Sequence, residues 1–323
     1  MPRGARAGRR RQSARGADVH GVLLVDKPAG LTSAEVVRRL KAKVGGKVGH
    51  LGTLDPFATG LLPMCLGEAT KIAQFLNASD KEYEGTIALG VATDTGDLTG
   101  ELRHERPVPG LTDADLDGVV AAFSGPLMQT PPMYSAIKRA GVPLYKLARQ
   151  GIEIEREPRP ISIHDLSLTR CDHSHLGFRV SCSKGTYIRV LAEDIGTALG
   201  TVAHLKSLRR TGFGDFRLEQ GAVDPLRWDP DTGGMPLSIR DALGDMPIVS
   251  LPRRAVDAVR RGQPWVLREF GPRQAGPGRA LFVGETGAAV AVVECDSGRW
   301  RFARVLKSDL SLQDEGTVVA PAG

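Results

Sequence analysis

The chain has 323 residues, 41 % of them apolar, which is enough to bury one large core or a large and a small one. Its formal charge of +6 comes entirely from residues 1–16, where six arginines stand without an acid, so residues 17–323 carry 37 basic and 37 acidic side chains. Any basic surface of the folded part must therefore arise from uneven distribution of charge. We expect residues 1–18 to form a disordered tail.

Targeting and redox features exclude several classes of protein. There is no run of about 18 apolar residues and no apolar leader after the arginines, so we expect no membrane span and a cytoplasmic location. The four cysteines include no Cys-x-x-Cys pair, which argues against a structural zinc site and against a disulfide framework. Because Walker A and dinucleotide-binding motifs are also absent from the sequence, we predict neither metal nor cofactor.

Hydrophobic periodicity predicts strands and helices in irregular order along the first half of the chain. Thr32, with Glu35 three residues later, forms a capping box for a helix whose apolar residues repeat at helical spacing. Thr112 starts a second helix of this kind. The predicted strands of this half are 21–25, 61–66 and 82–91.

The second half changes character twice. Residues 125–159 are rich in proline, glycine and basic side chains, so we interpret them as an insertion over one face of the core, with a short helix near 144–150. Past a proline and glycine linker, short valine-rich runs predict a β-rich module. We therefore predict an α/β protein of the α+β type, with strands at 161–168 and 176–182, a helix at 187–199, a main domain at 19–245, the linker at 225–234, the module at 247–310 and a tail at 311–323.

One loop suits chemistry better than packing. Residues 49–60 read GHLGTLDPFATG, so Asp55 stands among glycines, a proline and small hydroxyl residues. Glycine permits backbone angles closed to other residues, and Pro56 stiffens the chain after the carboxylate. A simple Asp-Pro turn is the alternative. Because the buried strand that follows would hold the loop rigid, we predict that Asp55 is a nucleophile.

At this point the motifs resemble, in their order, those of the TruB family of tRNA pseudouridine synthases, and its bacterial members in particular. They are LLVDKPAGLTS, GHLGTLDPFATGLL, GEATK, KEYEG, PPMYSAIKRAGVPLY and GTYIRVLAEDIG, within residues 21–216. The resemblance implies the pseudouridine synthase fold, with a mixed, mainly antiparallel central sheet, an RNA-gripping thumb at 125–159 and a PUA-like RNA-binding domain at 247–310. It also implies a monomer that converts the T-loop uridine 55 of tRNA to pseudouridine without metal, cofactor or obligatory protein partner.

The resemblance further implies roles for residues around Asp55. The matched aspartate acts on the sugar or base of a flipped-out uridine, and Arg189 pairs with it, orients it and keeps it ionised. Tyr83 stacks on the target base, His50 helps to displace the uridine, and Tyr187 is a further RNA contact. Without the resemblance, Arg189 would read equally well as a helix-face arginine and Tyr83 as a strand-surface aromatic.

Basic side chains form three clusters, at 134–160, 206–210 and 253–261. Each alone fits a solvated helix face, but three of them around one candidate site favour a phosphate-binding surface. The RNA contacts that we predict beyond the Asp55 loop and Tyr187 are Lys27, Lys71, Lys138, Arg139, Lys146, Arg209 and Arg210.

Two further motifs are interpreted as ordinary loops. Asp94-Thr95-Gly96 matches the aspartic-protease tripeptide, but such an enzyme needs a second copy, so we predict a polar turn. His173 and His175 have no further ligands at metal-binding spacing, so we predict a solvated loop.

Two alternative functions remain open. The first is a catalytically idle RNA-binding or tRNA-folding module, against which the intact Asp55, Tyr83 and Arg189 argue. The second is a ribosomal RNA pseudouridine synthase that works with guide RNA partners, which the long insertion at 125–159 disfavours.

Overall fold

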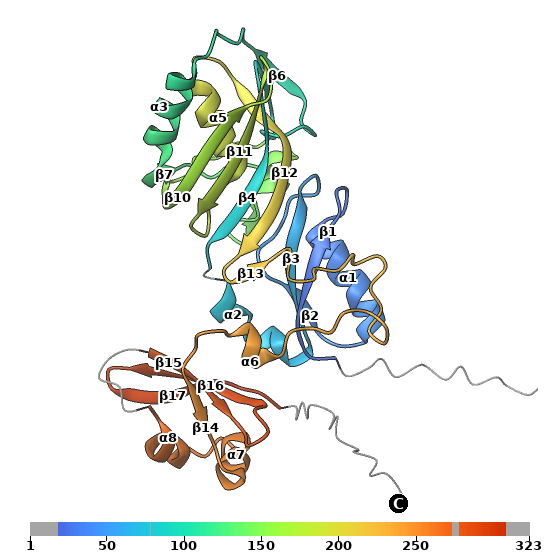
Figure 1. Ribbon diagram of the computed structural model, residues 1–323, viewed down its shortest axis with the longest axis vertical. Helices are drawn as coiled ribbons and strands as arrows, with labels where there is room; N and C mark the ends of the chain where they lie inside the picture. The colour runs from blue at the N-terminus through green and yellow to red at the C-terminus, as the bar shows by residue number, and fades with distance from the viewer. Residues whose placement is uncertain (1–18, 78, 273–277, 308–323) are drawn as a thin grey trace, which may run out of the picture.

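The computed structural model describes residues 19–77, 79–272 and 278–307. The predicted tails at 1–18 and 311–323, and residues 308–310 of the predicted module, lie outside these ranges. The described chain forms a large sheet flanked by helices and a separate small sheet at the C-terminal end (Figure 1). The predicted α/β class with a small C-terminal β-sheet is confirmed.

The large sheet has nine strands in the order β1-β3-β12-β4-β11-β10-β7, with β2 paired to β3 and β13 paired to β12. Only the short contact between β3 and β12 is parallel, so the sheet is mixed but mainly antiparallel, as predicted. Its strands are β1 (Gly21–Lys27), β2 (Val48–His50), β3 (Thr59–Leu66), β4 (Lys81–Leu89), β7 (Gly125–Gln129), β10 (Arg159–Arg170), β11 (His175–Cys182), β12 (Ala203–Phe213) and β13 (Phe216–Arg217).

The two faces of this sheet differ because strand side chains alternate between them. One face contributes Ile87, Phe178 and other apolar residues to the main core, together with apolar side chains of the three long helices. The opposite face carries the mutually adjacent Glu84, Arg179 and Arg209. The three helices are α1 (Ser33–Val44), α3 (Asp113–Phe123) and α5 (Ile188–Ala198).

Helix starts follow the predicted capping chemistry. The Thr32 side chain accepts a hydrogen bond from Glu35 N at 3.1 Å, and the Thr32 backbone donates to Glu35 Oε2 at 2.8 Å. Thr112 forms the same reciprocal pair with Asp115. These bonds satisfy amide groups that a first helical turn otherwise leaves without partners.

The predicted insertion at 125–159 needs a correction at both ends. Residues 125–129 form β7, an edge strand of the large sheet, and Arg159 already belongs to β10. The insertion therefore spans 130–158, which we call the thumb segment. It holds a small hairpin and the short helix that was predicted, as β8 (Lys138–Arg139), β9 (Val142–Pro143) and α4 (Leu144–Ala148). The remaining short elements of the main domain are η1 (Gly67–Lys71), α2 (Ala73–Leu76), β5 (Val91–Thr93), β6 (Leu102–Glu105) and α6 (Ile239–Ala242).

The predicted linker at 225–234 is wrong. Trp228 is buried in the main core with 3 % exposure, and Lys43 of α1 donates hydrogen bonds to the carbonyls of Pro225, Leu226 and Trp228. The segment is thus packed along the main domain. A proline and glycine composition does not reveal this, because one aromatic anchor was enough to hold the loop.

The C-terminal module has its own sheet, in the order β14-β15-β16-β17, and its own apolar cluster. A second cluster joins it to the main domain, since Leu281 and Val292 of the module share it with Leu61 and Phe213. The module consists of β14 (Ile248–Ser250), α7 (Arg253–Arg260), α8 (Trp265–Phe270), β15 (Gly278–Val283), β16 (Ala289–Asp296) and β17 (Arg299–Val305). No helix among the described residues is long and apolar enough to cross a membrane.

Candidate active site

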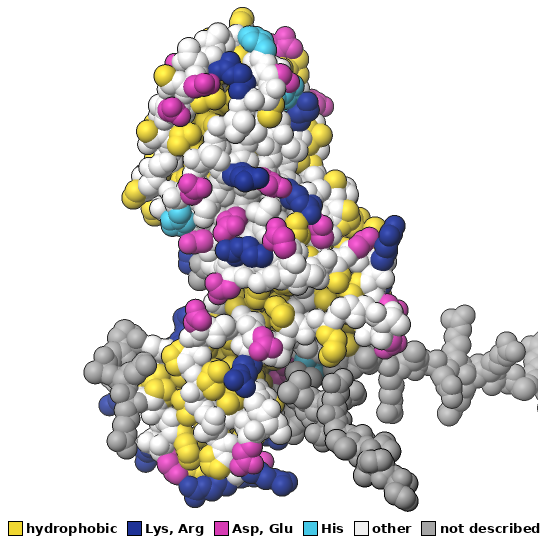
Figure 2. Space-filling view, viewed as in Figure 1, with side chains coloured by type: hydrophobic (Ala, Val, Ile, Leu, Met, Phe, Trp, Pro, Cys, Tyr) yellow, Lys and Arg dark blue, Asp and Glu magenta, His cyan; other side chains and the backbone are white. Residues whose placement is uncertain are grey.

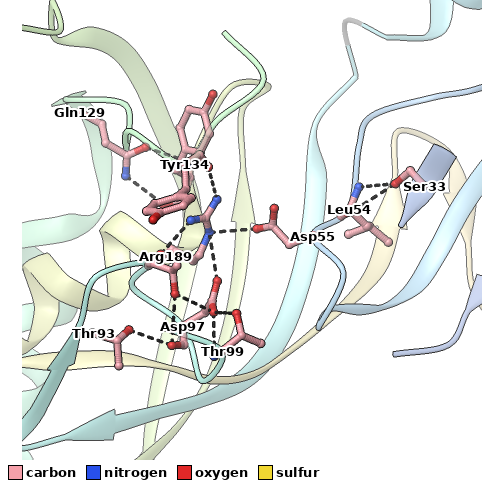
Figure 3. Close-up of polar contacts among 11 residues, drawn as sticks. Ser33, Leu54, Asp55, Thr93, Asp97, Thr99, Gln129, Tyr134 and Arg189 are labelled. Carbon is pink, nitrogen blue, oxygen red and sulfur yellow. Dashed lines mark hydrogen bonds and ion pairs between the residues drawn. The ribbon is translucent and has the colours of Figure 1, made fainter. Parts of the chain in front are cut away.

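The Asp55 loop connects β2 to β3 and is held by backbone contacts on both sides of the carboxylate. Ser33 Oγ accepts from Leu54 N at 2.9 Å and donates to Leu54 O at 3.1 Å (Figure 3). The carbonyl of Pro56 accepts from Gly30 N at 2.8 Å. The residues flanking Asp55 are therefore fixed, as the sequence predicted for a rigid loop.

Arg189, in the first turn of α5, makes the predicted ion pair with Asp55. Its Nε donates to Asp55 Oδ2 at 2.9 Å, while the Arg189 side chain is only 6 % exposed and that of Asp55 is 36 % exposed. The two terminal nitrogens of Arg189 donate to the backbone carbonyls of Thr95 at 2.8 Å and Tyr134 at 2.7 Å (Figure 3). The guanidinium is thus held from three segments, and it leaves one face of the Asp55 carboxylate open.

A second carboxylate, which the sequence analysis missed, lies on the same guanidinium. Asp97 Oδ2 is 3.8 Å from Arg189 Nε, and the Asp97 side chain is 7 % exposed. Its Oδ1 accepts hydrogen bonds from Thr95 Oγ1, Thr99 N and Thr99 Oγ1. The prediction that 94–96 form a polar turn is correct, but this turn also builds the site. The signal in the sequence was the dense run of Thr and Asp from 93 to 99.

Two aromatic side chains lie within electrostatic range of Asp55. Tyr83 on β4 and Tyr187, the residue before α5, are both half-buried. Burial is the main cause that raises the pKa of each phenol, and the charge of Asp55 adds to it. Gln129 holds Tyr187 in place, because its side-chain amide accepts from Tyr187 N at 2.8 Å and donates to Tyr187 O at 3.2 Å. Both predicted aromatics therefore lie near enough to Asp55 for its charge to act on them.

His50, at the end of β2, is half-buried. Burial lowers its pKa, and the nearby positive charge of Arg210 lowers it further. Its Nδ1 is buried and has no hydrogen-bond partner among the described residues. A buried nitrogen without a hydrogen bond raises the free energy of the folded protein. A new hydrogen-bond partner for Nδ1 would therefore stabilise this imidazole.

Two of the predicted RNA contacts are wrong, because their side chains are buried. Lys27 is 0 % exposed, and its Nζ donates to the carbonyls of Pro28, Leu31 and Pro56. Burial lowers the pKa of Lys27 to about 8.

Arg210 is 1 % exposed and likewise faces inward. Its guanidinium donates to the carbonyls of Leu61 at 2.7 Å, Gly52 at 2.9 Å and Leu51 at 3.4 Å, and it forms a hydrogen bond with the Tyr83 side chain. Lys27 and Arg210 therefore hold the Asp55 loop from inside, where phosphate has no access.

The other predicted cations divide by location. Lys71 pairs with Glu68 and donates to Val305 O at 3.0 Å, so it joins the main domain to the C-terminal module. Arg209 pairs with Asp26 at 2.8 Å on the sheet face opposite the core. The thumb cations Lys138, Arg139 and Lys146 are exposed.

The sheet face opposite the core has a depression of about 1020 Å³, lined in part by Pro56, Thr99 and Arg209. Asp55, Tyr83 and Arg189 do not line it. Charged side chains of both signs are mixed on the surface (Figure 2). On this face Arg179 lies 3.9 Å from Glu84. Glu84 and Arg179 line this depression, but none of the described tyrosines does.

A metal site is not supported in the described part of the chain. No group of three or more His, Cys, Asp or Glu side chains there could hold a metal ion. Of the two histidines predicted to lie in a loop, His175 instead begins β11, and its ring Nδ1 pairs with Asp172 Oδ1 at 2.9 Å.

The fold is that of the pseudouridine synthases, a class of isomerases. A model of the TruB family pseudouridylate synthase N-terminal domain matches residues 38–188, and one of the tRNA pseudouridylate synthase B C-terminal domain matches 189–224. The chain belongs to the TruB family.

Individual relatives support the same placement. The chain is 45 % identical over 300 residues to the tRNA pseudouridine synthase B of Cupriavidus metallidurans, a match covering 90 % of this chain and 95 % of that protein. It is 48 % identical over 255 residues to that of Nitrosococcus oceani, covering 77 % and 83 %. A chain of the Cbf5-Nop10-Gar1 complex aligns with a TM-score of 0.63 at 24 % identity, covering 90 % and 84 %, which shows a shared fold.

Proposed function

We propose that this protein converts the T-loop uridine 55 of tRNA to pseudouridine, with Asp55 as the nucleophile. The observation that carries the proposal is the Asp55–Arg189 pair, which fixes one carboxylate oxygen and leaves the group 36 % exposed. Relatives named tRNA pseudouridine synthase B supply the substrate class.

The reaction is an isomerisation: it replaces one bond between ribose and uracil with another and leaves the composition unchanged. The C–N bond between ribose and uracil breaks, the uracil turns, and a C–C bond forms, with a proton passing from uracil C5 to the freed nitrogen. A carboxylate oxygen of Asp55 can take part by bonding transiently to ribose C1′ or to the base. Because the base stays in the pocket, no second carboxyl group is required to activate water, in contrast to glycoside hydrolysis.

The neighbours of Asp55 have separate tasks in this scheme. Arg189 orients the carboxylate, since its remaining nitrogens are fixed by backbone carbonyls and it cannot swing away. Tyr83 offers a ring on which a flipped-out uracil stacks, a contact worth about 1 to 3 kcal/mol. His50, whose Nδ1 has no hydrogen-bond partner among the described residues, helps to displace the uridine from the T loop.

RNA is held by exposed cations away from this pocket. Lys138, Arg139 and Lys146 of the thumb segment contact phosphates, and the C-terminal module acts as a PUA-like RNA-binding domain. The protein works as a monomer and needs neither guide RNA nor a protein partner.

A T-arm transcript tests the function directly. We expect the purified protein alone to form pseudouridine at the position that corresponds to uridine 55, and Asp55→Asn to abolish turnover by about 10⁴-fold or more while RNA binding persists. Asp231→Asn, the same change on an exposed loop, should match wild type. Product that appears only when a guide RNA is added would favour the ribosomal alternative, and wild-type turnover by Asp55→Asn would overturn the assignment.

A further inference from the structure

A carboxyl group one helical turn beyond Arg189 has no assigned task. Glu193 lies on the same face of α5, four residues after Arg189, and it is half-buried. Among the described residues no side chain or backbone group makes a hydrogen bond or ion pair with its carboxyl. A partly buried ionisable group without a partner destabilises the folded protein when it is charged. The presence of Glu193 beside the site therefore needs an explanation.

Glu193 packs directly against the turn that positions Arg189. A Cβ placed on Gly96 would lie 2.5 Å from Glu193 Oε1 and 3.5 Å from Arg189 Cβ, and Gly96 has a left-handed φ of +70°. A side chain at this position would be strained by the left-handed backbone and would displace the Glu193 carboxyl. Residues 94–97 therefore rest on Arg189 and Glu193 together, and the turn presents Thr95 O to Arg189 and Asp97 to the same guanidinium.

The charge balance of this cluster is unfavourable if Glu193 ionises. Arg189 already serves two carboxylates, Asp55 at 2.9 Å and Asp97 at 3.8 Å. An ionised Glu193 would be a third negative charge around one buried guanidinium. Since like charges repel strongly where water is scarce, it would push Asp97 away and compete with Asp55 for Arg189.

We propose that Glu193 is a positioning residue that must carry a proton for the 94–97 turn to keep Arg189 aligned on Asp55. This inference rests on the proposed function of Asp55. In its neutral form the Glu193 carboxyl fills the space above Gly96 and does not compete with Asp55 for the positive charge of Arg189.

The surrounding groups support this assignment. Burial is the largest cause that raises the pKa of Glu193, to about 7; the charges of Asp194 and Asp97 raise it too, while those of Arg189 and Arg103 lower it. Bound RNA adds negative charge near the site and raises this pKa further. The proton is therefore held most firmly in the complex.

The test is the pH dependence of pseudouridine formation on a T-arm transcript. In wild type we expect kcat/KM to fall above pH 7, by about tenfold per pH unit well above the midpoint, and kcat to fall at a higher pH because it reports the complex. Glu193→Gln should remove this fall at high pH, the alkaline limb, from the pH profiles of both kcat/KM and kcat. The reason is that the glutamine amide stays neutral at every pH and so mimics the protonated carboxyl. An unchanged limb in Glu193→Gln would overturn the inference, whereas a wild type inactive at every pH would instead refute the proposed function.

Two charge variants make the test independent of Glu193→Gln. Asp194→Asn removes a charge that raises this pKa, so the limb should move to lower pH, and Arg103→Gln should move it to higher pH. A residue with a purely structural role would not give shifts of opposite sign. Limbs that coincide with wild type in both variants would contradict the proposal.

Thermal unfolding gives a readout without substrate. The pKa of Glu193 is raised above its ordinary value of 4.5 on folding, so its contribution to stability is complete below pH 4.5 and is lost as the pH rises to about 7. We expect Glu193→Gln to have a higher Tm relative to wild type at pH 8 than at pH 4.5. A Tm difference that does not change with pH would show that Glu193 carries no such proton.

Discussion

The basic residues beneath the Asp55 loop and those of the thumb segment act in opposite ways. Beneath the loop, Lys27 and Arg210 are 0 % and 1 % exposed and donate to backbone carbonyls. On the thumb segment, Lys138 and Lys146 point into solvent. The same residue types therefore hold the Asp55 loop in one region and, in the proposed function, offer positive charge to RNA in the other.

The difference follows from the cost of burying a cation. A buried Lys or Arg must replace lost water with hydrogen-bond acceptors, and the carbonyls of a tight glycine-rich loop supply them. An exposed cation keeps its hydration and has no such cost. When it contacts a phosphate of RNA, counterions of the RNA are released. Removing a buried cation should therefore affect stability and kcat, and removing exposed ones should affect KM and its salt dependence.

Arg210→Met should have the largest effect in this comparison. The carbonyls of Leu51, Gly52 and Leu61 and the Tyr83 hydroxyl would lose a donor, which we expect to lower the free energy of unfolding by about 3 kcal/mol or more. Urea denaturation measures this. The control is Arg209→Met at the neighbouring position, which removes a surface pair worth at most about 1 kcal/mol. Equal losses in the two variants would erase the distinction between buried and exposed cations.

Lys27→Met should come next. Pro56 O, directly after Asp55, loses one of its donors, so we expect the loop to shift and kcat to fall about tenfold with KM nearly unchanged. Steady-state kinetics on a T-arm transcript separate the two constants. Lys41→Met, at an exposed position of α1, is the matched control and should behave as wild type. A rise in KM with an unchanged kcat would contradict this prediction and would indicate that Lys27 contacts RNA.

Removing the thumb cations should have the smallest effect on the folded protein. The triple variant Lys138→Ala, Arg139→Ala, Lys146→Ala should raise KM and reduce the slope of log affinity against log salt by about 2 to 3, with kcat and Tm close to wild type. A triple alanine variant at exposed positions of α1, Arg38, Arg39 and Lys41, controls for total charge. Equal salt slopes in the two triple variants would show that the thumb segment does not contact phosphate.

Features that depend on neighbours in sequence were predictable. The capping box at Thr32, the helix after Thr112 and the alternating strands β10 and β11 all appear near their predicted places. The Asp55–Arg189 pair was predicted too, through the order of family motifs, although 134 residues separate the partners. Local periodicity alone would have left Arg189 as a helix-face cation.

Other contacts between segments that are far apart in the sequence were not predictable. Asp97 looked like part of a polar turn, and only the packing of that turn on α5 brought its carboxylate to Arg189. Gln129 sat at the start of a supposed insertion, and only the pairing of β7 with β10 placed its amide on Tyr187.

The sequence by itself determined which residue types the proposed function can use: a lone aspartate in a glycine-rich turn, tyrosines, and many arginines and lysines. The tertiary structure decided which cations face inward and which face solvent. Helical and strand periods report which face of an element is apolar, but a long cationic side chain can bury or expose its head group from the same backbone position. The acceptors around it decide between the two, and several of them, such as Pro56 O at Lys27 and Gly52 O at Arg210, come from segments far away in the chain.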